Sequence, residues 1–271
     1  MRRMLRKLTA VLLIMILCIS ICGCGTGTGY GVKAVQTLVE QEYSLAFRND
    51  DPTAYYVIAA IQELNDEGKV NELATKWFGQ RIITFPATNF RLSDLTPTEY
   101  REFIIGIDIN SFPLAYAANG EYWGFDVELA VAVCAKLGWH INMQPIEKEN
   151  VYIELSSGNI DCAWGGIALD SQEVENRIYA RYGPYVENDI VVAVRTTSTT
   201  FTKMMLSGKK MVMPSTPEAM DALNSDPKLS QRLGQITRLA GGTTECFTQL
   251  YAGKCDAVLT DSTALYYFNS H

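Results

Sequence analysis

The sequence predicts an α/β protein built from two lobes, on the basis of two observations. The first is that two stretches 95 residues apart share one pattern: LSSGNIDCAWGG at Leu155–Gly166 and LYAGKCDAVLTD at Leu250–Asp261. Each has a leucine, then a glycine three residues later, then an aspartate and an apolar run. The second is that strand, loop and helix patterns alternate from Ile104 onward, which is typical of parallel α/β units.

Each of these two matching stretches indicates a helix that is followed at once by a strand. Gly158 and Gly253 would end the helices, because glycine tolerates the left-handed conformation that follows a last helical turn. The apolar runs after them are typical of strands that are covered on both faces. We therefore expect one such step in each lobe, with the strand ends Trp164–Gly166 and Thr260–Asp261 on the two sides of a cleft.

The first 24 residues indicate an export signal that is not part of the fold. Four basic residues lie within the first seven positions, and the apolar run at 8–21 is too short to span a bilayer. The run ends in ICGC, which resembles a bacterial lipoprotein processing site at Cys24. The alternatives are processing at Cys22 and an ordinary signal anchor. We expect a signal peptide at 1–23, a lipid on Cys24 and a flexible tether at 24–31.

The composition is that of an ordinary globular protein, with 48% apolar and 20% charged residues. Removal of the four basic residues in the signal takes the formal net charge from −7 to −11. A surface this acidic argues against a nucleic-acid partner and against binding to anionic lipid, so the lipid anchor would be the only membrane contact. No cysteine pair has metal-ligand spacing, and no cofactor or metal is expected. Buried free thiols are favoured over disulfides for the cysteines after the signal: Cys134, Cys162, Cys246 and Cys255.

The remaining elements follow from periodicity and capping signals. Residues 32–47 have strand-like alternation. A helix is predicted after Asp51, with Pro52 at its first position and Gly68 at its end. Further helices are predicted to end at Gly79, to start at Thr96–Glu99, to span Phe125–Leu137 and about Val151–Ser157, and to begin near Thr216 and Thr243.

Several motifs together identify a family resemblance. They are GFDVEL (Gly124–Leu129), LSSGNID (Leu155–Asp161), GPYVEN (Gly183–Asn188), SGKKMVM (Ser207–Met213), LYAGKCDAVLTDS (Leu250–Ser262) and the helical segment at Asp50–Gly79. This set resembles the type 2 extracellular solute-binding proteins of amino-acid ABC transporters, bacterial family 3, over nearly all of the chain after the tether. The resemblance implies a periplasmic-binding-protein type 2 fold in which each lobe is a mixed, mostly parallel sheet flanked by helices. It also implies a monomer that delivers a small polar solute, an amino acid first of all, to ABC permease subunits.

The order of these motifs is rotated relative to the family, in which the segment at 43–79 comes last. The chain therefore resembles a circular permutant whose original ends are joined by residues 81–103, although a rearranged gene fragment is an alternative. Lobe 1 would be 44–194, and lobe 2 would be 32–43 plus 199–271. Strand-like crossings near Tyr43–Phe47 and Ile190–Arg195 would form the hinge.

The resemblance also implies a binding site between the lobes. Asp261 matches the family's ammonium-binding aspartate, although it also suits a helix N-cap. Gly165, Gly166 and the adjoining Ile167 end the first matching strand, where backbone groups would meet the ligand, although glycine there is also explained by packing. Thr216 opens a helix whose free N–H groups suit a carboxylate, although a plain N-cap explains it as well.

The ligand side chain is expected near the end of the first strand of lobe 1. Asp108 matches a position that contacts the ligand side chain. Ser111 aligns with the family's stacking aromatic residue, and Phe112 lies beside it. A loop phenylalanine that only packs is the alternative for Phe112.

Two departures from the family bear on the ligand. The family's arginine that clamps the ligand carboxylate has no counterpart at the matching position here. Arg177 is the nearest arginine. Lys148 lies where the family often has an aromatic residue that forms a wall of the site. Loss of that arginine points either to a solute that is not a standard amino acid or to its replacement by Arg177 and Lys148, and an acidic ligand would suit these two cations. No catalytic residue is expected. The alternatives are a dehydratase-like enzyme using Glu173 or Asp108, and a solute-sensing receptor subunit.

Overall fold

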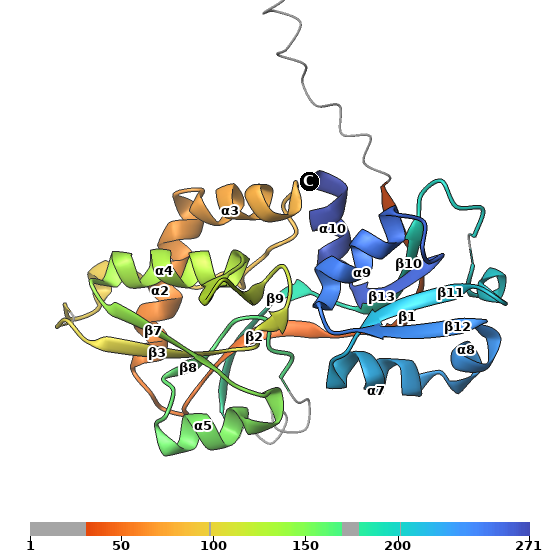
Figure 1. Cartoon of the computed structure of the whole chain (residues 1–271). Coiled ribbons are helices and arrows are strands. Elements are labelled where there is room, and N and C mark those ends of the chain that lie inside the picture. The colour runs from red at the N-terminus through yellow and green to blue at the C-terminus, as the bar shows by residue number, and fades with distance from the viewer. Residues whose placement is uncertain (1–30, 98, 170–178, 201) are drawn as a thin grey trace, which may run out of the picture. The chain divides into compact units, whose positions relative to one another are not determined.

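Two five-stranded mixed sheets form the framework of the protein (Figure 1). The computed structural model describes residues 31–97, 99–169, 179–200 and 202–271. Sheet A contains, in spatial order, β1 (Val32–Val39), β10 (Ile190–Arg195), β13 (Ala257–Asp261), β11 (Lys210–Pro214) and β12 (Gln235–Leu239). Sheet B contains β7 (His140–Pro145), β3 (Glu102–Ile107), β8 (Cys162–Ala163), β2 (Glu42–Phe47) and β9 (Ala180–Glu187). The expected α/β class with mixed sheets is thereby confirmed.

Helices cover both faces of each sheet, as the apolar strands require. Figure 1 shows α2 (Thr53–Asp66), α3 (Lys69–Phe78) and α4 (Phe125–Leu137) on one face of sheet B, and α5 (Val151–Ser157) on the other. It shows α9 (Gly242–Tyr251) and α10 (Ser262–Ser270) on one face of sheet A, and α7 (Pro217–Ser225) and α8 (Pro227–Arg232) on the other. The smaller elements are the antiparallel strands β4 (Asn110–Ser111), β5 (Ala115–Ala118) and β6 (Glu121–Trp123), and the 3₁₀ turns η1 (Leu92–Asp94), η2 (Lys148–Asn150) and η3 (Lys203–Leu206).

The two matching stretches form the predicted helix-to-strand steps, one in each sheet. Helix α5 is followed by Gly158, whose φ of 77° is left-handed, and then by β8 in sheet B. Helix α9 is followed by Gly253, with φ 69°, and then by β13 in sheet A. Strand β8 is shorter than its apolar run suggests, because the chain turns at the glycine pair after Trp164.

The chain passes between the sheets at residues 40–41 and 188–189. The backbone N–H of Asn188 donates to the carbonyl of Gln41 over 2.9 Å, so the two crossing segments are paired. The crossings expected at Tyr43–Phe47 and Ile190–Arg195 are misplaced, because β2 belongs wholly to sheet B and β10 wholly to sheet A. The strand-like apolar pattern is present on both sides of each crossing. Only short polar segments mark the places where the chain passes from one sheet to the other.

Two predicted helix starts are also corrected. Helix α2 begins at Thr53, one residue later than expected, and Asp51 Oδ1 accepts a hydrogen bond from the Thr53 N–H over 2.9 Å. Among the described residues near Thr96–Glu99 no helix forms. Thr96 instead lies against α2, where the Tyr56 hydroxyl donates to its carbonyl over 3.1 Å.

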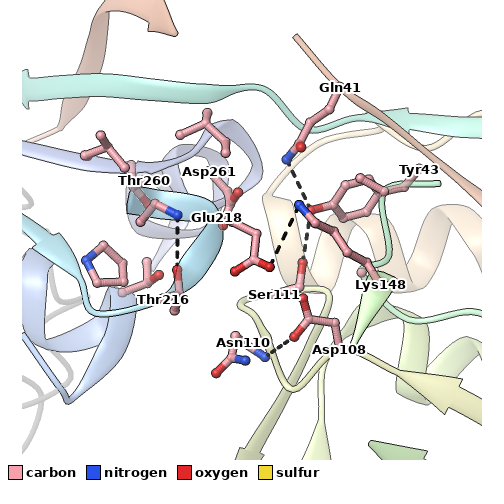
Figure 2. Close-up of a pocket in the computed structure, with 17 residues that line it drawn as sticks. Gln41, Tyr43, Asp108, Asn110, Ser111, Lys148, Thr216, Glu218, Thr260 and Asp261 are labelled. Carbon is pink, nitrogen blue, oxygen red and sulfur yellow. Dashed lines mark hydrogen bonds and ion pairs between the residues drawn. The ribbon is translucent and has the colours of Figure 1, made fainter. Parts of the chain in front are cut away.

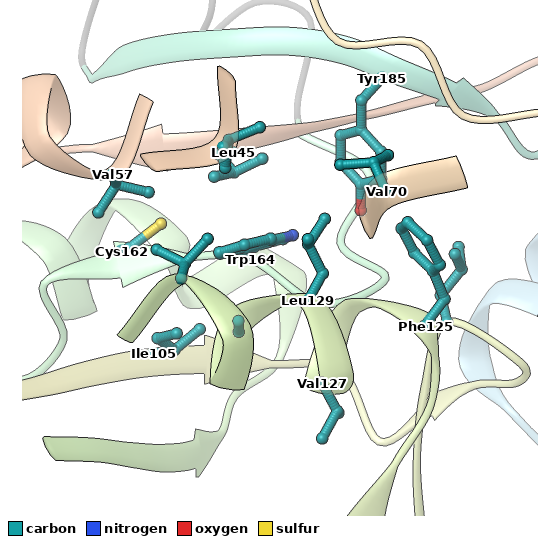
Figure 3. Packing of buried hydrophobic residues seen from close by; sticks show 14 of the residues in the cluster. Leu45, Val57, Val70, Ile105, Phe125, Val127, Leu129, Cys162, Trp164 and Tyr185 are labelled. Atoms are coloured by element: carbon teal, nitrogen blue, oxygen red, sulfur yellow. The ribbon is translucent and has the colours of Figure 1, made fainter. Parts of the chain in front are cut away.

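The hydrophobic core of sheet B includes Trp164, which comes just before the glycine pair that leads to the cavity described below. Leu45, Val57, Leu129 and Trp164 pack together from β2, α2, α4 and the end of the first matching stretch (Figure 3). All four are at most 1% exposed, and burial of a side chain of this kind stabilises the fold by about 1.5–3 kcal/mol. The four cysteines after the signal are buried and free, which confirms the expectation of unpaired thiols.

Candidate functional site

A cavity of about 540 Å³, which includes space open to solvent, lies at the carboxyl ends of strands from both sheets (Figure 2). Strands β3 and β8 are parallel neighbours in sheet B, and β11 and β13 are parallel neighbours in sheet A. Ligands of α/β proteins bind at this edge of a parallel sheet. The cavity is lined by Gln41, Tyr43, Asp108, Asn110, Ser111, Lys148, Gly166, Ala168, Ile190, Pro214, Thr216, Glu218, Ala219, Thr243, Leu259, Thr260 and Asp261.

The cavity brings together most of the residues singled out in the sequence. Asp108, Ser111, Lys148, Gly166, Thr216 and Asp261 all line it. Their contact with a solute stays a prediction. The two matching stretches therefore end at one cavity, with Gly166 on the side of sheet B and Asp261 on the side of sheet A.

Three other predicted site residues are not among the lining residues. Phe112 packs into a buried cluster, with its ring centroid 4.8 Å from that of Tyr267 and 5.0 Å from that of Tyr116. Ile167 is 1% exposed and packs in another cluster. The carbonyl of Gly165 accepts a hydrogen bond from the Asp108 N–H over 2.9 Å. Phe112 and Gly165 thus have contacts of the kind that the packing alternative describes, and a contact of either residue with a solute stays a prediction.

Several predictions fall on residues outside the described part of the chain. These are the signal peptide at 1–23, the lipidation site Cys24, most of the tether, and Arg177 and Glu173.

Asp261 and Asp108 are carboxylates without an ion-pair partner within the described residues. Burial raises the pKa of Asp261 to about 7, and the negative charges of Asp108 and Glu218 raise it further. Burial likewise raises the pKa of Asp108 to about 6, assisted by Glu218 and Glu147, while the Asn110 N–H donates to Asp108 Oδ1 over 2.8 Å and opposes the rise. A bound cation would therefore stabilise the charged form of both groups.

Gly166 is held in place by a buried carboxylate from the GFDVEL motif. Asp126 Oδ2 accepts hydrogen bonds from the Gly166 N–H over 2.9 Å and from the Tyr185 hydroxyl over 2.7 Å. Burial raises the pKa of Asp126 to about 7, although these hydrogen bonds lower it. Gly166 has φ 70°, and an added Cβ would overlap the side chain of Ser111. Glycine is therefore required here by both backbone and space.

Helix α7 presents its N-terminus to the cavity. Thr216 Oγ1 accepts from the Ala219 N–H over 3.3 Å, so this threonine caps the helix as well as lining the cavity. Glu218, in the first turn, has its Oε1 atom 3.9 Å from Lys148 Nζ (Figure 2). Because Lys148 lies in η2 and Glu218 in α7, this ion pair joins elements associated with the two different sheets.

Sequence reasoning missed several lining residues. The Tyr43 hydroxyl lies 3.3 Å from Ser111 Oγ and accepts from Gln41 Nε2 over 3.4 Å (Figure 2). Tyr43 carried only a strand signal in the sequence, because the alternation at 43–47 does not show which side chain reaches a cavity. Glu218 carried only the signal of an acidic first turn, which suits any helix N-terminus.

The described residues contain no cluster of histidine, cysteine, aspartate or glutamate that could hold a metal ion. Among the same residues, no helix is long and apolar enough to cross a membrane.

Comparison with known proteins identifies a family and a curated relative. Residues 103–240 match the family described as bacterial extracellular solute-binding proteins, family 3. The Bacillus subtilis protein named "probable amino-acid-binding protein YxeM" is 30% identical over 88 residues, which are 32% of this chain and 33% of that protein.

Solved structures are similar over a larger part of the chain. The substrate-binding protein of a polar amino acid ABC uptake transporter from Streptococcus thermophilus is 26% identical, with a TM-score of 0.45, over 59% of this chain and 61% of that one. The substrate-binding protein of an ABC uptake transporter from Streptococcus pneumoniae, with bound histidine, is 25% identical, with a TM-score of 0.44, over 62% and 68%. The chain thus spans about a third of the length of the curated relative and about three fifths of the S. thermophilus protein.

Proposed function

Because the chain belongs to family 3 of the bacterial extracellular solute-binding proteins, we propose that it binds an amino acid in the cavity between its sheets and delivers it to an ABC permease. The observation that carries this proposal is the shared cavity of Gly166 and Asp261, which end the two matching stretches. The name of the B. subtilis relative supports an amino acid as the solute class. Membership of a solute-binding family also agrees with the expectation that the protein is not an enzyme.

The chemistry of the cavity suits a free amino acid. Asp261 supplies a carboxylate for the α-ammonium group, and the N-terminus of α7 supplies a dipole that favours the α-carboxylate. Lys148 supplies a cation for the same carboxylate. A ligand that touches residues on both sides would favour a closed arrangement, because it gains contacts there that an open one lacks.

Titration of the purified protein with the twenty standard amino acids tests this function. We expect saturable heat of binding for at least one of them, a smaller radius of gyration by X-ray scattering when it is bound, and loss of both effects in Asp261→Ala. Binding without any change in Asp261→Ala would remove Asp261 from the site. Absence of binding by every amino acid would contradict the proposed function.

We also propose that the chain is a circular permutant of its family. Asn269 Oδ1 accepts from the Val32 N–H over 2.7 Å, and Asn269 Nδ2 donates to the Val32 carbonyl over 3.0 Å, which supports an original connection between these segments. Residues 79–101 then join α3 to β3. A variant with a short linker from Asn269 to Val32 and new ends within 86–100 is expected to keep its amino-acid affinity. Failure of that variant to fold would count against permutation.

The lobes and the anchor complete the proposal. The lobe limits of 44–194, and of 32–43 plus 199–271, are best moved to the sheet changes at 40–41 and 188–189. Cys24 would carry the lipid that holds a monomeric receptor at the outer surface of the membrane, close to its permease. Mass spectrometry of the membrane-bound protein should find a diacylglyceryl mass on Cys24, and Cys24→Ala should release the protein from the membrane.

A further inference from the structure

The charge that lines the cavity is predominantly negative. Three carboxylates face it, from the loop after β3 (Asp108), the first turn of α7 (Glu218) and the end of β13 (Asp261). Among the described lining residues, Lys148 is the one that carries a positive charge. Its ammonium group is shared between Glu218 at 3.9 Å and Glu149 at 4.0 Å. When these groups are ionised, the described lining therefore has an excess of two negative charges.

These carboxylates oppose one another across the cavity. The pKa of Asp261, raised first by burial, is raised further by the charges of Asp108 and Glu218, and Glu218 acts on Asp108 in the same way. Such mutual effects occur when charged groups face a common, poorly solvated space. A cation in that space would relieve the repulsion, whereas an anion would add to it.

The three carboxylates come from three different elements, which bears on the kind of cation that fits. They do not converge into a cluster able to hold a metal ion, so one small ion would not satisfy them together. A ligand with two cationic groups some distance apart would. An α-amino acid with a cationic side chain has that property, because its α-ammonium group and its side-chain charge are separated by several bonds.

We propose that the solute is an amino acid with a cationic side chain, selected by Asp108 and Glu218; this rests on the proposed function. Asp261 receives the α-ammonium group, and Lys148, released from Glu218, receives the α-carboxylate. Asp108 and Glu218 then receive the side-chain cation. This proposal replaces the acidic ligand that Lys148 and Arg177 suggested in the sequence. The reason is that the negative charges of Glu218 and Asp108 exceed the positive charge of Lys148. Arg177 lies outside the described residues, so its charge is not included in the charge of the described lining.

Calorimetric titration of the purified protein with L-arginine, L-lysine, L-glutamine and L-glutamate tests the proposal. We expect L-arginine or L-lysine to have a Kd about tenfold or more below that of L-glutamine, with L-glutamate the weakest. Equal or tighter binding of L-glutamine or L-glutamate would overturn this inference and leave the proposed function intact. If no standard amino acid binds, both fail.

Isosteric variants then test the two selecting residues. In Asp108→Asn combined with Glu218→Gln, the Kd of the cationic ligand should rise about tenfold or more, while that of L-glutamine should change less than about threefold. Glu149→Gln is the matched control, since Glu149 is also near Lys148 but does not line the cavity. The thermal unfolding midpoint confirms that each variant folds. An equal loss of affinity for both ligands would overturn the assignment of selectivity to these residues.

Discussion

Lys148 Nζ lies 3.9 Å from Glu218 Oε1, in an ion pair that spans the cavity from η2 to α7. The side chains are 32% and 23% exposed. A partly solvated pair at this separation contributes at most about 1 kcal/mol. The interaction is therefore weak enough for the charged groups of a ligand to replace it.

Replacement of Lys148 by methionine should affect binding more than stability. We expect the free energy of unfolding to change by less than about 1 kcal/mol, because the pair is solvated. The affinity for every amino acid tested should fall about fivefold or more, because the α-carboxylate loses its cation. Urea unfolding and calorimetry measure the two quantities.

Lys209→Met is the control for that variant. Lys209 forms an ion pair of similar length with Asp256, at 3.7 Å, and does not line the cavity. Its replacement should leave ligand affinity unchanged. If Lys148→Met binds amino acids as tightly as the parent protein, Lys148 has no part in carboxylate recognition.

Gly166→Ala should be more destabilising than Gly158→Ala. Both glycines have a left-handed φ, of 70° and 77°, so each substitution carries a backbone cost of about 1–2 kcal/mol. At Gly158 an added Cβ meets nothing within 4 Å, whereas at Gly166 it overlaps the Ser111 side chain. We expect an additional loss of about 1–3 kcal/mol at Gly166 by urea unfolding.

The companion substitution Ser111→Gly removes the group that the new methyl would meet. It should recover part of the stability lost in Gly166→Ala. If the double variant is as unstable as the sum of the two single variants, the overlap with Ser111 is not the cause.

The arrangement at Gly166 and Asp261 could be predicted from the sequence because it depends on local rules. A glycine-terminated helix followed by a buried strand gives a parallel unit, and the carboxyl ends of such units gather ligand sites. The roles of Phe112 and Glu218 depend on tertiary placement. Phe112 packs against α10, which comes much later in the chain, and Glu218 faces the cavity only because α7 is placed opposite η2. No local pattern encodes these relationships.

Asp126→Ala should destabilise the fold far more than Asp126→Asn. Alanine would leave the Gly166 N–H and the Tyr185 hydroxyl unpaired in the core, which costs about 2–5 kcal/mol. Asparagine keeps an oxygen that can accept both hydrogen bonds and removes a buried charge. We therefore expect a loss below about 1.5 kcal/mol for asparagine by urea unfolding. Similar losses for both substitutions would show that the carboxylate charge itself is needed.

The ligand-free protein should become less stable as the pH rises from about 4 toward 7. Burial raises the pKa of Asp126 from 3.8 to about 7, so in this range the folded state binds more protons than the unfolded state. Stability conferred by protonated Asp126 is thus present at low pH and lost as the pH passes the folded pKa. The loss attributable to Asp126 is on the order of 2–4 kcal/mol.

Urea unfolding at about pH 5 and pH 8 measures this loss. Asp126→Asn should have a shallower decline with pH, because its side chain does not titrate. If the stability of Asp126→Asn falls with pH as steeply as that of the parent protein, other groups cause the pH dependence. Asp108 and Asp261 are such groups, because their pKa values are also raised.

Binding of L-arginine should strengthen as the pH rises from about 5 to 8, opposite to the trend in stability. The pKa values of Asp108 and Asp261 are raised to about 6 and about 7, so at the lower pH both carboxyls carry protons that a cationic ligand must displace. We expect the Kd to fall by about tenfold or more across this range, with release of protons on binding. Within the described part of the chain, the ionisable groups that face these two carboxyls are Glu218, Glu147, Lys148 and Tyr43. Calorimetry in buffers of different ionisation enthalpy counts the protons released, and Asp108→Asn should release fewer. A Kd independent of pH would show that neither carboxyl loses a proton when the ligand binds.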